Sequence, residues 1–380
     1  MIKLCKGTSA DLDELKDFIN LAFLLNPPIE KLAPKTYAKD SDCEKYHYLI
    51  KENGRIRGAL CALPVSFSVC GQELHSLSIG AVSVHRDDRN KGYMQMMVNA
   101  ALEDARKEGW ADFSMLGGNR QRYGYFGYES GGLQITTSLL GRNVRHALSD
   151  VCTDHISINA ISPNDTEMLA RAAELYCTEP IHALRDPSRF YEILVTWAAK
   201  PYAVFDNGKM IGYVVLNGNV VSECVLEDYS RMEEVACAVV KKLSPDGIVF
   251  QDSVTVPQRL RFYENYCESY SIDHNKRYLI FRYEPMICSY LTLKASLTAL
   301  PEGELVLGIT GYHNMRVKYC GGKVTCEETD ASADIVIPAD KAVSFLFSPM
   351  RSVYGYNIAS NILANAWFPL PLFCPRQDVN

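Results

Sequence analysis

The chain has 380 residues, 47% of them hydrophobic and 22% charged, and a formal net charge of -6 at pH 7. This length suits two or three domains, and the acidic balance argues against a nucleic-acid partner, which needs a basic surface. The sequence has no run of about 18 apolar residues and no signal-peptide pattern, so we expect a cytosolic protein without a membrane partner. Thirteen cysteines without a C-x-x-C pair or a Cys/His cluster predict reduced thiols and no metal site.

The first elements predicted along the chain are a helix and a β-hairpin. Residues 11–25 have the apolar spacing of a helix, and Pro27-Pro28 ends it. Residues 46–62 alternate in two runs joined by Asn53-Gly54, the strongest short-range signal for a hairpin. Two further strands of the same sheet are predicted at residues 64–69 and 73–84.

Residues 82–94, VSVHRDDRNKGYM, connect the last of these strands to a helix through a charged loop. The N-terminus of a helix carries unpaired N–H groups and the positive end of the helix dipole, and this loop adds Arg89 and Lys91. Such an arrangement suits an anion such as a pyrophosphate, although a loop that merely caps the helix has the same composition. The helix, over residues 94–106, has one apolar face formed by Met94, Met97, Val98, Ala101, Leu102 and Ala105. A short strand at residues 113–116 and a turn rich in glycine and tyrosine at residues 117–132 follow.

Two segments of this first region recur later in the chain. YAVFDNGKMIG at residues 202–212 aligns without a gap to YLIKENGRIRG at residues 48–58, and RLRFYENYCES at 259–269 aligns to RQRYGYFGYES at 120–130. Because both matches occur in the same order, we predict a duplicated domain. The interval between the two later segments contains no R-x-x-G loop, so we expect the second copy to have lost the anion site.

The pattern changes from about residue 285. Short β-patterned runs separated by turns predict a small sheet domain with two helices. The proline-rich and aromatic segment 367–380 cannot form a long helix, but it can dock elsewhere. The predicted strands are 291–297, 304–309, 315–319, 323–326 and 333–337, and the predicted helices lie near 339–347 and 357–365.

The order of strand, R-x-x-G-x-x loop, helix and strand resembles motif A of the GCN5-related N-acetyltransferases (GNAT). The YGYFGYES turn, the repeat and the C-terminal strands, with A-D-I-V-I at residues 333–337, are similar to the Eis (enhanced intracellular survival) branch. This resemblance implies an α/β fold with mixed sheets and three domains. They are a catalytic GNAT domain at residues 1–145, a degenerate GNAT-like domain at 146–284, and a sterol-carrier-protein-like domain with a tail at 285–380.

The same resemblance implies acetyl-CoA as cosubstrate and no metal. The pantetheine amides are expected along one strand edge, and the pyrophosphate at the loop and the helix start. Met94 departs from the general GNAT pattern, which has glycine or alanine at this position. Sequences of the Eis branch commonly have a larger aliphatic residue there. The cofactor-binding residues expected on this basis are Val82, Ser83, Val84, Arg89, Asn90, Lys91, Gly92, Tyr93 and Met94.

Tyr123 matches the tyrosine that the family uses as general acid. A phenol beside the sulfur can serve in this role, since it can protonate the departing thiolate. The alternative is that Tyr123 only packs in an aromatic cluster. Phe262 takes its place in the second copy, so the hydroxyl is lost together with the loop. As the base, the resemblance implies the C-terminal carboxylate of Asn380. The carboxylate of Asp378 is an alternative, and an idle tail is a third possibility.

We therefore predict an acetyl-CoA-dependent N-acetyltransferase. The acceptor would be a multi-amine small molecule such as a polyamine or an aminoglycoside, attacked in a ternary complex. The competing hypothesis is a non-catalytic sensor of CoA or lipid. His85 and Glu129 are predicted to be structural, because no second histidine lies at ligand spacing and Glu129 recurs as Glu268. The resemblance also implies a homo-oligomer, with a hexamer as one option.

Overall fold

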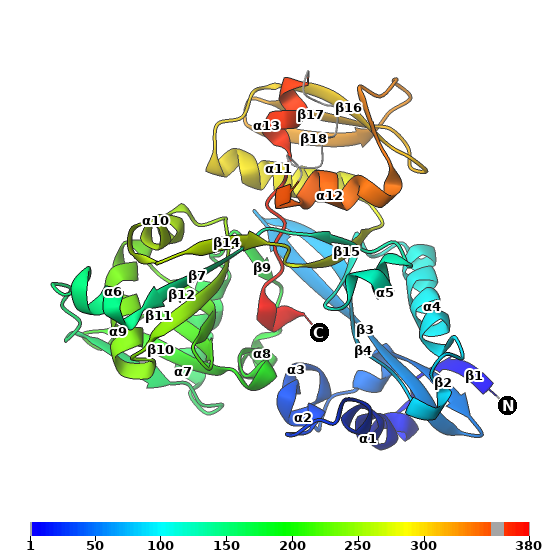
Figure 1. The fold of residues 1–380 in the computed structure, drawn as a ribbon, viewed down its shortest axis with the longest axis horizontal. Coiled ribbons are helices and arrows are strands. Elements are labelled where there is room, and N and C mark those ends of the chain that lie inside the picture. The colour runs from blue at the N-terminus through cyan, green and yellow to red at the C-terminus, as the bar shows by residue number, and fades with distance from the viewer. Residues whose placement is uncertain (1, 351–360, 380) are drawn as a thin grey trace.

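The computed structural model describes residues 2–350 and 361–379, which form three sheets with helices packed on them (Figure 1). The sheets have eight, seven and four strands. Each contains antiparallel pairs and at least one parallel pair, as in β4–β5, β12–β13 and β16–β19. The predicted α/β fold with mixed sheets is thus confirmed. Within the described residues, no helix is both long and apolar enough to cross a bilayer.

The first sheet has the order β1-β2-β3-β4-β5-β15-β6, and β9 pairs with β3. Successive strand residues point to opposite faces, so Ile50 packs with α4 whereas Leu49 packs with α1 on the other face. These strands are β1 (Ile2–Lys6), β2 (His47–Glu52), β3 (Arg55–Val69), β4 (Gln72–Val84), β5 (Phe113–Leu116), β6 (Glu129–Gly131), β9 (Ile181–Ala183) and β15 (Lys276–Ile280). The helices are α1 (Leu12–Phe23), α2 (Ile29–Leu32), α3 (Pro34–Tyr37), α4 (Tyr93–Glu108) and α5 (Arg120–Gly124).

The second sheet has the order β14-β7-β13-β12-β11-β10-β8, and α9 packs on it with a face of buried aliphatic residues. Its strands are β7 (Gln134–Leu140), β8 (Ile156–Ala160), β10 (Lys200–Asp206), β11 (Lys209–Asn217), β12 (Val220–Leu226), β13 (Gly247–Ser253) and β14 (Tyr270–Asp273). The helices are α6 (Gly141–His146), α7 (Thr166–Tyr176), α8 (Phe190–Leu194), α9 (Met232–Leu243) and α10 (Pro257–Tyr266).

The two repeated sequence segments have the same local structure. β2–β3 and β10–β11 are hairpins that turn at Asn53-Gly54 and Asn207-Gly208, with positive φ at all four residues, as a tight Asn-Gly turn requires. Each hairpin also has a bulge at the same place, just before Gly58 and just before Gly212. The matching turn and bulge support an origin of both hairpins from one ancestral unit.

The first two sheets exchange strands. β7 follows directly after β6 of the first sheet in sequence, yet it lies between β13 and β14 of the second sheet. In the other direction, β15 lies between β5 and β6, and β9 pairs with the far end of β3. Neither sheet is therefore built from one uninterrupted stretch of chain.

The third sheet has the order β18-β17-β16-β19 and packs against α11. Its strands are β16 (Gly303–Ile309), β17 (Met315–Cys320), β18 (Lys323–Glu328) and β19 (Ile335–Ile337), with helices α11 (Tyr283–Leu297), α12 (Ala342–Phe347) and α13 (Ile362–Trp367). The strand predicted at residues 291–297 is wrong, because these residues complete α11. Buried residues surround this helix, which hides its 3.6-residue period in the sequence. Part of the helix predicted near residues 357–365 lies outside the described residues.

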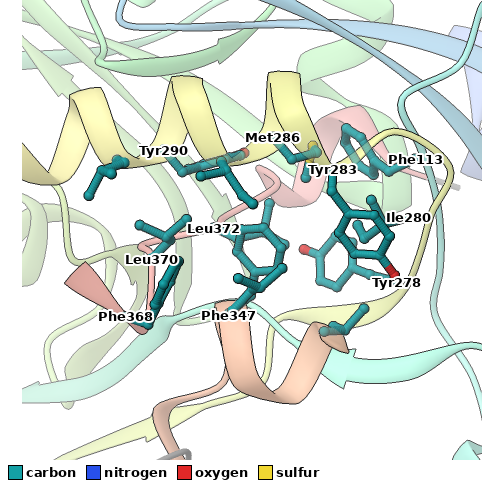
Figure 2. Close-up of a cluster of buried hydrophobic side chains, with 14 of the residues drawn as sticks. Phe113, Tyr278, Ile280, Tyr283, Met286, Tyr290, Phe347, Phe368, Leu370 and Leu372 are labelled. Atoms are coloured by element: carbon teal, nitrogen blue, oxygen red, sulfur yellow. The ribbon is translucent and has the colours of Figure 1, made fainter. Parts of the chain in front are cut away.

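One large core joins the first sheet, α11, α12 and the C-terminal tail. Figure 2 shows Tyr283, Met286 and Tyr290 of α11 on one side of this core and Phe347 of α12 on the other. Leu370 and Leu372 of the tail fill the space between the two helices. The described part of the tail is therefore packed into the protein interior, and Figure 1 shows it running from the third sheet toward the other two.

Candidate active site

The strands β4 and β5 separate partway along the first sheet. They pair in parallel from Ser76–Phe113 to Ile79–Leu116, and β4 then continues to Val84 without β5 beside it. A β-bulge lies where they part, since β4 has one residue more than β3 there and Ala81 has a φ of 48°. The edge of β4 over residues 82–84 is therefore free to form hydrogen bonds with an extended ligand.

The loop after β4 is fixed by a buried carboxylate. Asp88 accepts hydrogen bonds from Lys91 Nζ and from Arg57 Nε, each at 2.5 Å. These two cations, Lys91 first, hold the pKa of Asp88 below its usual value. Gly92 caps α4 with a φ of 79°, a left-handed conformation that a side chain would strain. The first intrahelical bond runs from Met96 N to Gly92 O, which leaves the earlier N–H groups of the helix available.

A cavity of about 600 Å³ lies between this loop, the free edge of β4, and the helices α1 and α5. Eight of the nine residues predicted to bind the cofactor line it: Val82, Ser83, Val84, Arg89, Asn90, Gly92, Tyr93 and Met94. Lys91 does not line it, because its ammonium group is directed to Asp88. Phe23, Arg122, Tyr125 and Phe126 also line the cavity, although the sequence did not point to them.

One charged group at this cavity lacks a partner in the part of the chain that the structure describes. The guanidinium of Arg89 forms no ion pair or hydrogen bond there, and it is exposed. With the helix amides and the strand edge, it fits a ligand that combines a pyrophosphate with an amide-containing arm, as CoA does.

Tyr123 of α5 is buried and is not among the residues that line the cavity, although Arg122 before it and Tyr125 and Phe126 after it are. Its ring packs edge to face against Tyr128, with 6.2 Å between ring centroids. Its hydroxyl has no hydrogen bond within the described residues, and burial raises the pKa of Tyr123. The phenol therefore keeps its proton at neutral pH. Asn119, which sequence reasoning missed, starts α5 by accepting hydrogen bonds from Gln121 N and Arg122 N.

Gly118 provides the space for the Tyr123 ring. A Cβ added at Gly118 would lie 2.6 Å from Tyr123 Cε2, and its φ of 147° is one that other residues rarely adopt. We expect Gly118→Ala to displace the ring and to lower the rate of the reaction proposed below by about tenfold or more, since small misplacements cost that much. Steady-state kinetics measures this effect. Gly124→Ala is the control, because a Cβ there meets no atom within 4 Å.

Arg89 gives a second prediction at this cavity. We expect Arg89→Gln to raise the Kd for CoA by about tenfold, or about 1.4 kcal/mol, through loss of one charge-assisted contact. Isothermal titration calorimetry at fixed ionic strength measures it. Arg55→Gln removes the same charge from the β2–β3 turn, where Arg55 pairs with Glu14, and should leave the Kd unchanged. Equal Kd values for both variants would show that Arg89 does not contact the ligand.

The matching cleft of the second sheet is filled. β12 and β13 pair only at Val220–Val249 and Val221–Phe250 before they separate. Arg259 of α10 then donates from Nη1 to Cys224 O at 3.0 Å, and it forms ion pairs with Glu179 and Asp252. Only about 30 Å³ remains there, and Phe373 and Pro375 of the tail are among the residues that line it.

Cys224 corresponds to Val82 of the first copy. The repeat aligns Gly58 with Gly212, and these two glycines pair with Val84 and Leu226 respectively. Two residues before each partner stand Val82 and Cys224. In the second copy, Arg259 thus donates a hydrogen bond to the backbone carbonyl of Cys224. At the matching position of the first copy, Val82, the edge of the strand is free.

The tail ends against α3 and is held by buried ion pairs. Asp378 accepts from Arg185 Nε at 2.7 Å and from Tyr176 Oη at 2.7 Å, while Arg185 also pairs with Glu223. Lys35 Nζ donates to Gln377 O at 2.8 Å and Val379 O at 2.7 Å. Burial lowers the pKa of Lys35 to about 7. Asn380, the predicted base, lies outside the described residues.

The two residues predicted to be structural make structural contacts. His85 accepts a hydrogen bond from Asp87 N and lies 3.0 Å from Arg57 Nη2 through its Nδ1. Glu129 accepts from Ser344 N and Oγ, which ties β6 to α12. Its counterpart in the repeat, Glu268, binds Arg142 and Asn143.

Comparison with known proteins agrees with this geometry. The acetyltransferase (GNAT) domain family matches residues 4–131, whereas no curated protein matches the chain. GCN5-related N-acetyltransferases from Kribbella flavida and Anabaena variabilis each superpose on this chain with a TM-score of 0.68 at 16% identity. The match to the Kribbella flavida protein covers 97% of this chain and 96% of that protein. The match to the Anabaena variabilis protein covers 99% of this chain and 98% of that protein. Eis1 from Mycobacterium abscessus has a TM-score of 0.63 at 14% identity, covering 99% of this chain and 98% of its own. Residues 4–131 thus form a GNAT acetyltransferase domain, and the chain as a whole has the fold of these GCN5-related N-acetyltransferases.

Proposed function

We propose that the protein transfers an acetyl group from acetyl-CoA to a primary amine of a multi-amine small molecule, such as a polyamine or an aminoglycoside. The observation that carries this proposal is the 600 Å³ cavity, where a free strand edge, the N-terminus of α4 and Arg89, which has no partner among the described residues, meet. GNAT domains use acyl-CoA, and the multi-amine acceptor follows from the resemblance of the sequence to the Eis branch.

In this proposal the pantetheine arm forms hydrogen bonds with the edge of β4 at Val82, Ser83 and Val84. The pyrophosphate lies at the first turn of α4, beside Arg89 and Asn90. Lys91 acts indirectly, because with Arg57 it holds Asp88 and so sets the loop conformation. Gly92, Tyr93 and Met94 supply the backbone N–H groups. This assignment places the thioester near the bulge at Ala81, where β4 and β5 part.

The reaction is a direct acyl transfer. The neutral amine nitrogen attacks the thioester carbonyl carbon, and the strand amides stabilise the oxyanion. The C–S bond then breaks, and Tyr123 donates its phenolic proton to the thiolate. The amine loses one proton to a base, so the products are an amide and CoA thiol.

We assign the base to the C-terminal carboxylate of Asn380 rather than to the side chain of Asp378. The Asp378 carboxylate already accepts hydrogen bonds from Arg185 and Tyr176, so both of its oxygens are occupied by donors from the protein. Lys35 and Arg185 fix the preceding residues beside α3. The tail would in this way bring the end of the chain to the catalytic domain.

The remaining parts of the chain have supporting roles in this proposal. Residues 1–145 form the catalytic domain, residues 146–284 a degenerate GNAT-like domain, and residues 285–380 a sterol-carrier-protein-like domain with the tail. The filled cleft at Arg259 supports the degenerate assignment. We also propose that the protein is cytoplasmic and forms a homo-oligomer. Light scattering of the purified protein tests the oligomeric state.

An acetylation assay tests the function. Purified protein is mixed with acetyl-CoA and a panel of polyamines and aminoglycosides, free thiol is followed over time, and the acceptor is analysed by mass spectrometry. We expect thiol release together with acceptors that carry one added acetyl group. Thermal stabilisation by CoA without thiol release on any acceptor would instead identify a CoA sensor.

A further inference from the structure

A second large cavity lies on the opposite face of α5 from the first. It has a volume of about 720 Å³ and is lined by residues of α5, β6, β15 and α12, and Figure 1 shows α5, β15 and α12 close together. No residue lines both cavities. On α5, Arg120 and Gly124 line this second cavity, whereas Arg122, and Tyr125 just after the helix, line the first. The two spaces are therefore separate sites that share one helix.

Positive side chains dominate the wall of this cavity. Arg120 and Arg277 both line it, and neither forms an ion pair or a side-chain hydrogen bond with any residue in the described ranges. The Nε atom of Arg277 is buried and has no hydrogen-bond partner. Burial first, and then the neighbouring charge of Arg120, lowers the pKa of Arg277, which indicates that the two guanidinium groups lie near each other.

The acidic groups of the wall do not neutralise these arginines. Glu129 accepts hydrogen bonds from Ser344, and Asp340 pairs with Lys341. His274, which also lines the cavity, lies 2.9 Å from Ser348 Oγ through its Nε2. Two guanidinium groups consequently line the cavity without a counterion among the residues that the structure describes.

This arrangement differs from that of Arg185 and Arg259, whose side chains are buried. Arg185 pairs with Asp378 and Glu223, and Arg259 pairs with Glu179 and Asp252, so each buried guanidinium has two carboxylates. The whole chain carries a net charge of -6 and does not lack carboxylates. An adjacent pair of unpaired arginines at a cavity is thus the feature that a ligand would explain.

We propose that this cavity is a second anion-binding site, where Arg120 and Arg277 bind a small molecule with several phosphate or carboxylate oxygens. Guanidinium groups bind such oxyanions through two parallel N–H donors, and about 720 Å³ is within the usual range for small-molecule pockets. This site is independent of acetyl transfer, because it uses none of the residues assigned to acetyl-CoA.

Calorimetry of the full-length protein with inorganic pyrophosphate tests this site. Saturating CoA is present, so that the loop before α4 is occupied, and salt is held constant. We expect pyrophosphate still to bind, and Arg277→Gln and Arg120→Gln each to weaken it by about tenfold or more, through loss of a charge-assisted contact. The control is Arg261→Gln, which removes an exposed arginine of α10 and should change nothing. Citrate in a parallel titration distinguishes a carboxylate ligand from a phosphate ligand.

The outcomes are decisive in both directions. Binding of either probe that depends on Arg120 and Arg277 but not on Arg261 supports the site. Absence of binding by both probes, or binding equal in all three variants, overturns it. Loss of pyrophosphate binding when CoA is added also overturns it, because the probe then occupied the first cavity. Arg120 is exposed, so Arg120→Gln remains informative even if Arg277→Gln folds poorly.

Discussion

Tyr123→Phe is expected to lower kcat by about 10²- to 10⁴-fold, the usual contribution of a positioned general acid, while the Kd for CoA stays nearly unchanged. The variant keeps the ring that packs on Tyr128 and loses only the hydroxyl, which has no hydrogen bond within the described residues. Removing it leaves no protein group unpaired, so stability should be preserved. Steady-state kinetics and a CoA titration measure the two quantities.

The matched control is Tyr125→Phe, at the residue that follows α5. Tyr125 lines the first cavity, and its exposed hydroxyl accepts a hydrogen bond from Gln95 Nε2 at 2.9 Å. If Tyr123 is the acid, Tyr125→Phe should change kcat by no more than a few fold. Equal losses in the two variants, or full activity in Tyr123→Phe, would remove Tyr123 from the acid role and leave it as a packing residue.

Arg185→Met is expected to destabilise the protein by about 3–5 kcal/mol, the usual cost of leaving a buried charge without its partner. The Arg185 side chain is 3% exposed and lies between Asp378 and Glu223, whose side chains are 3% and 4% exposed. Methionine fills a similar volume but provides no cation for these carboxylates. Because Asp378 belongs to the tail, we expect the tail to detach first, and this gives faster proteolysis of the C-terminus as well as a lower urea midpoint.

Arg171→Met is the control for this substitution. Arg171 also pairs with two carboxylates, Glu174 and Glu227, but its side chain is 32% exposed. Solvent screening limits such surface pairs, so we expect a loss below about 1 kcal/mol. A similar loss in both variants would mean that burial of the Arg185 cluster adds nothing to its contribution.

Local features of the fold could be predicted from the sequence. The Asn-Gly turns require positive φ, so both hairpins were recognisable. The strand, loop and amphipathic helix of residues 82–106 occur as predicted, because a charged loop before a helix with one apolar face has few other solutions. Eight of the nine predicted cofactor-binding residues line one cavity, because they are neighbours in sequence.

Long-range features could not be predicted in this way. The ion pair of Arg185 with Asp378 joins residues 193 positions apart, and no local pattern marks it. The exchange of β7 and β15 between sheets depends on tertiary packing, since each strand alone fits either sheet. Lys91 was predicted to face the anion because of its charge, but the buried Asp88 is the nearer partner. The α11 segment looked like a strand because a helix that is buried on several sides loses its period.

We expect only the first copy to bind acetyl-CoA, because its strand edge is free whereas Arg259 fills the second cleft. The stoichiometry of CoA binding to the purified chain, determined by calorimetry, tests this claim most directly. We predict one CoA per chain. Two CoA molecules per chain, or none, would contradict the account.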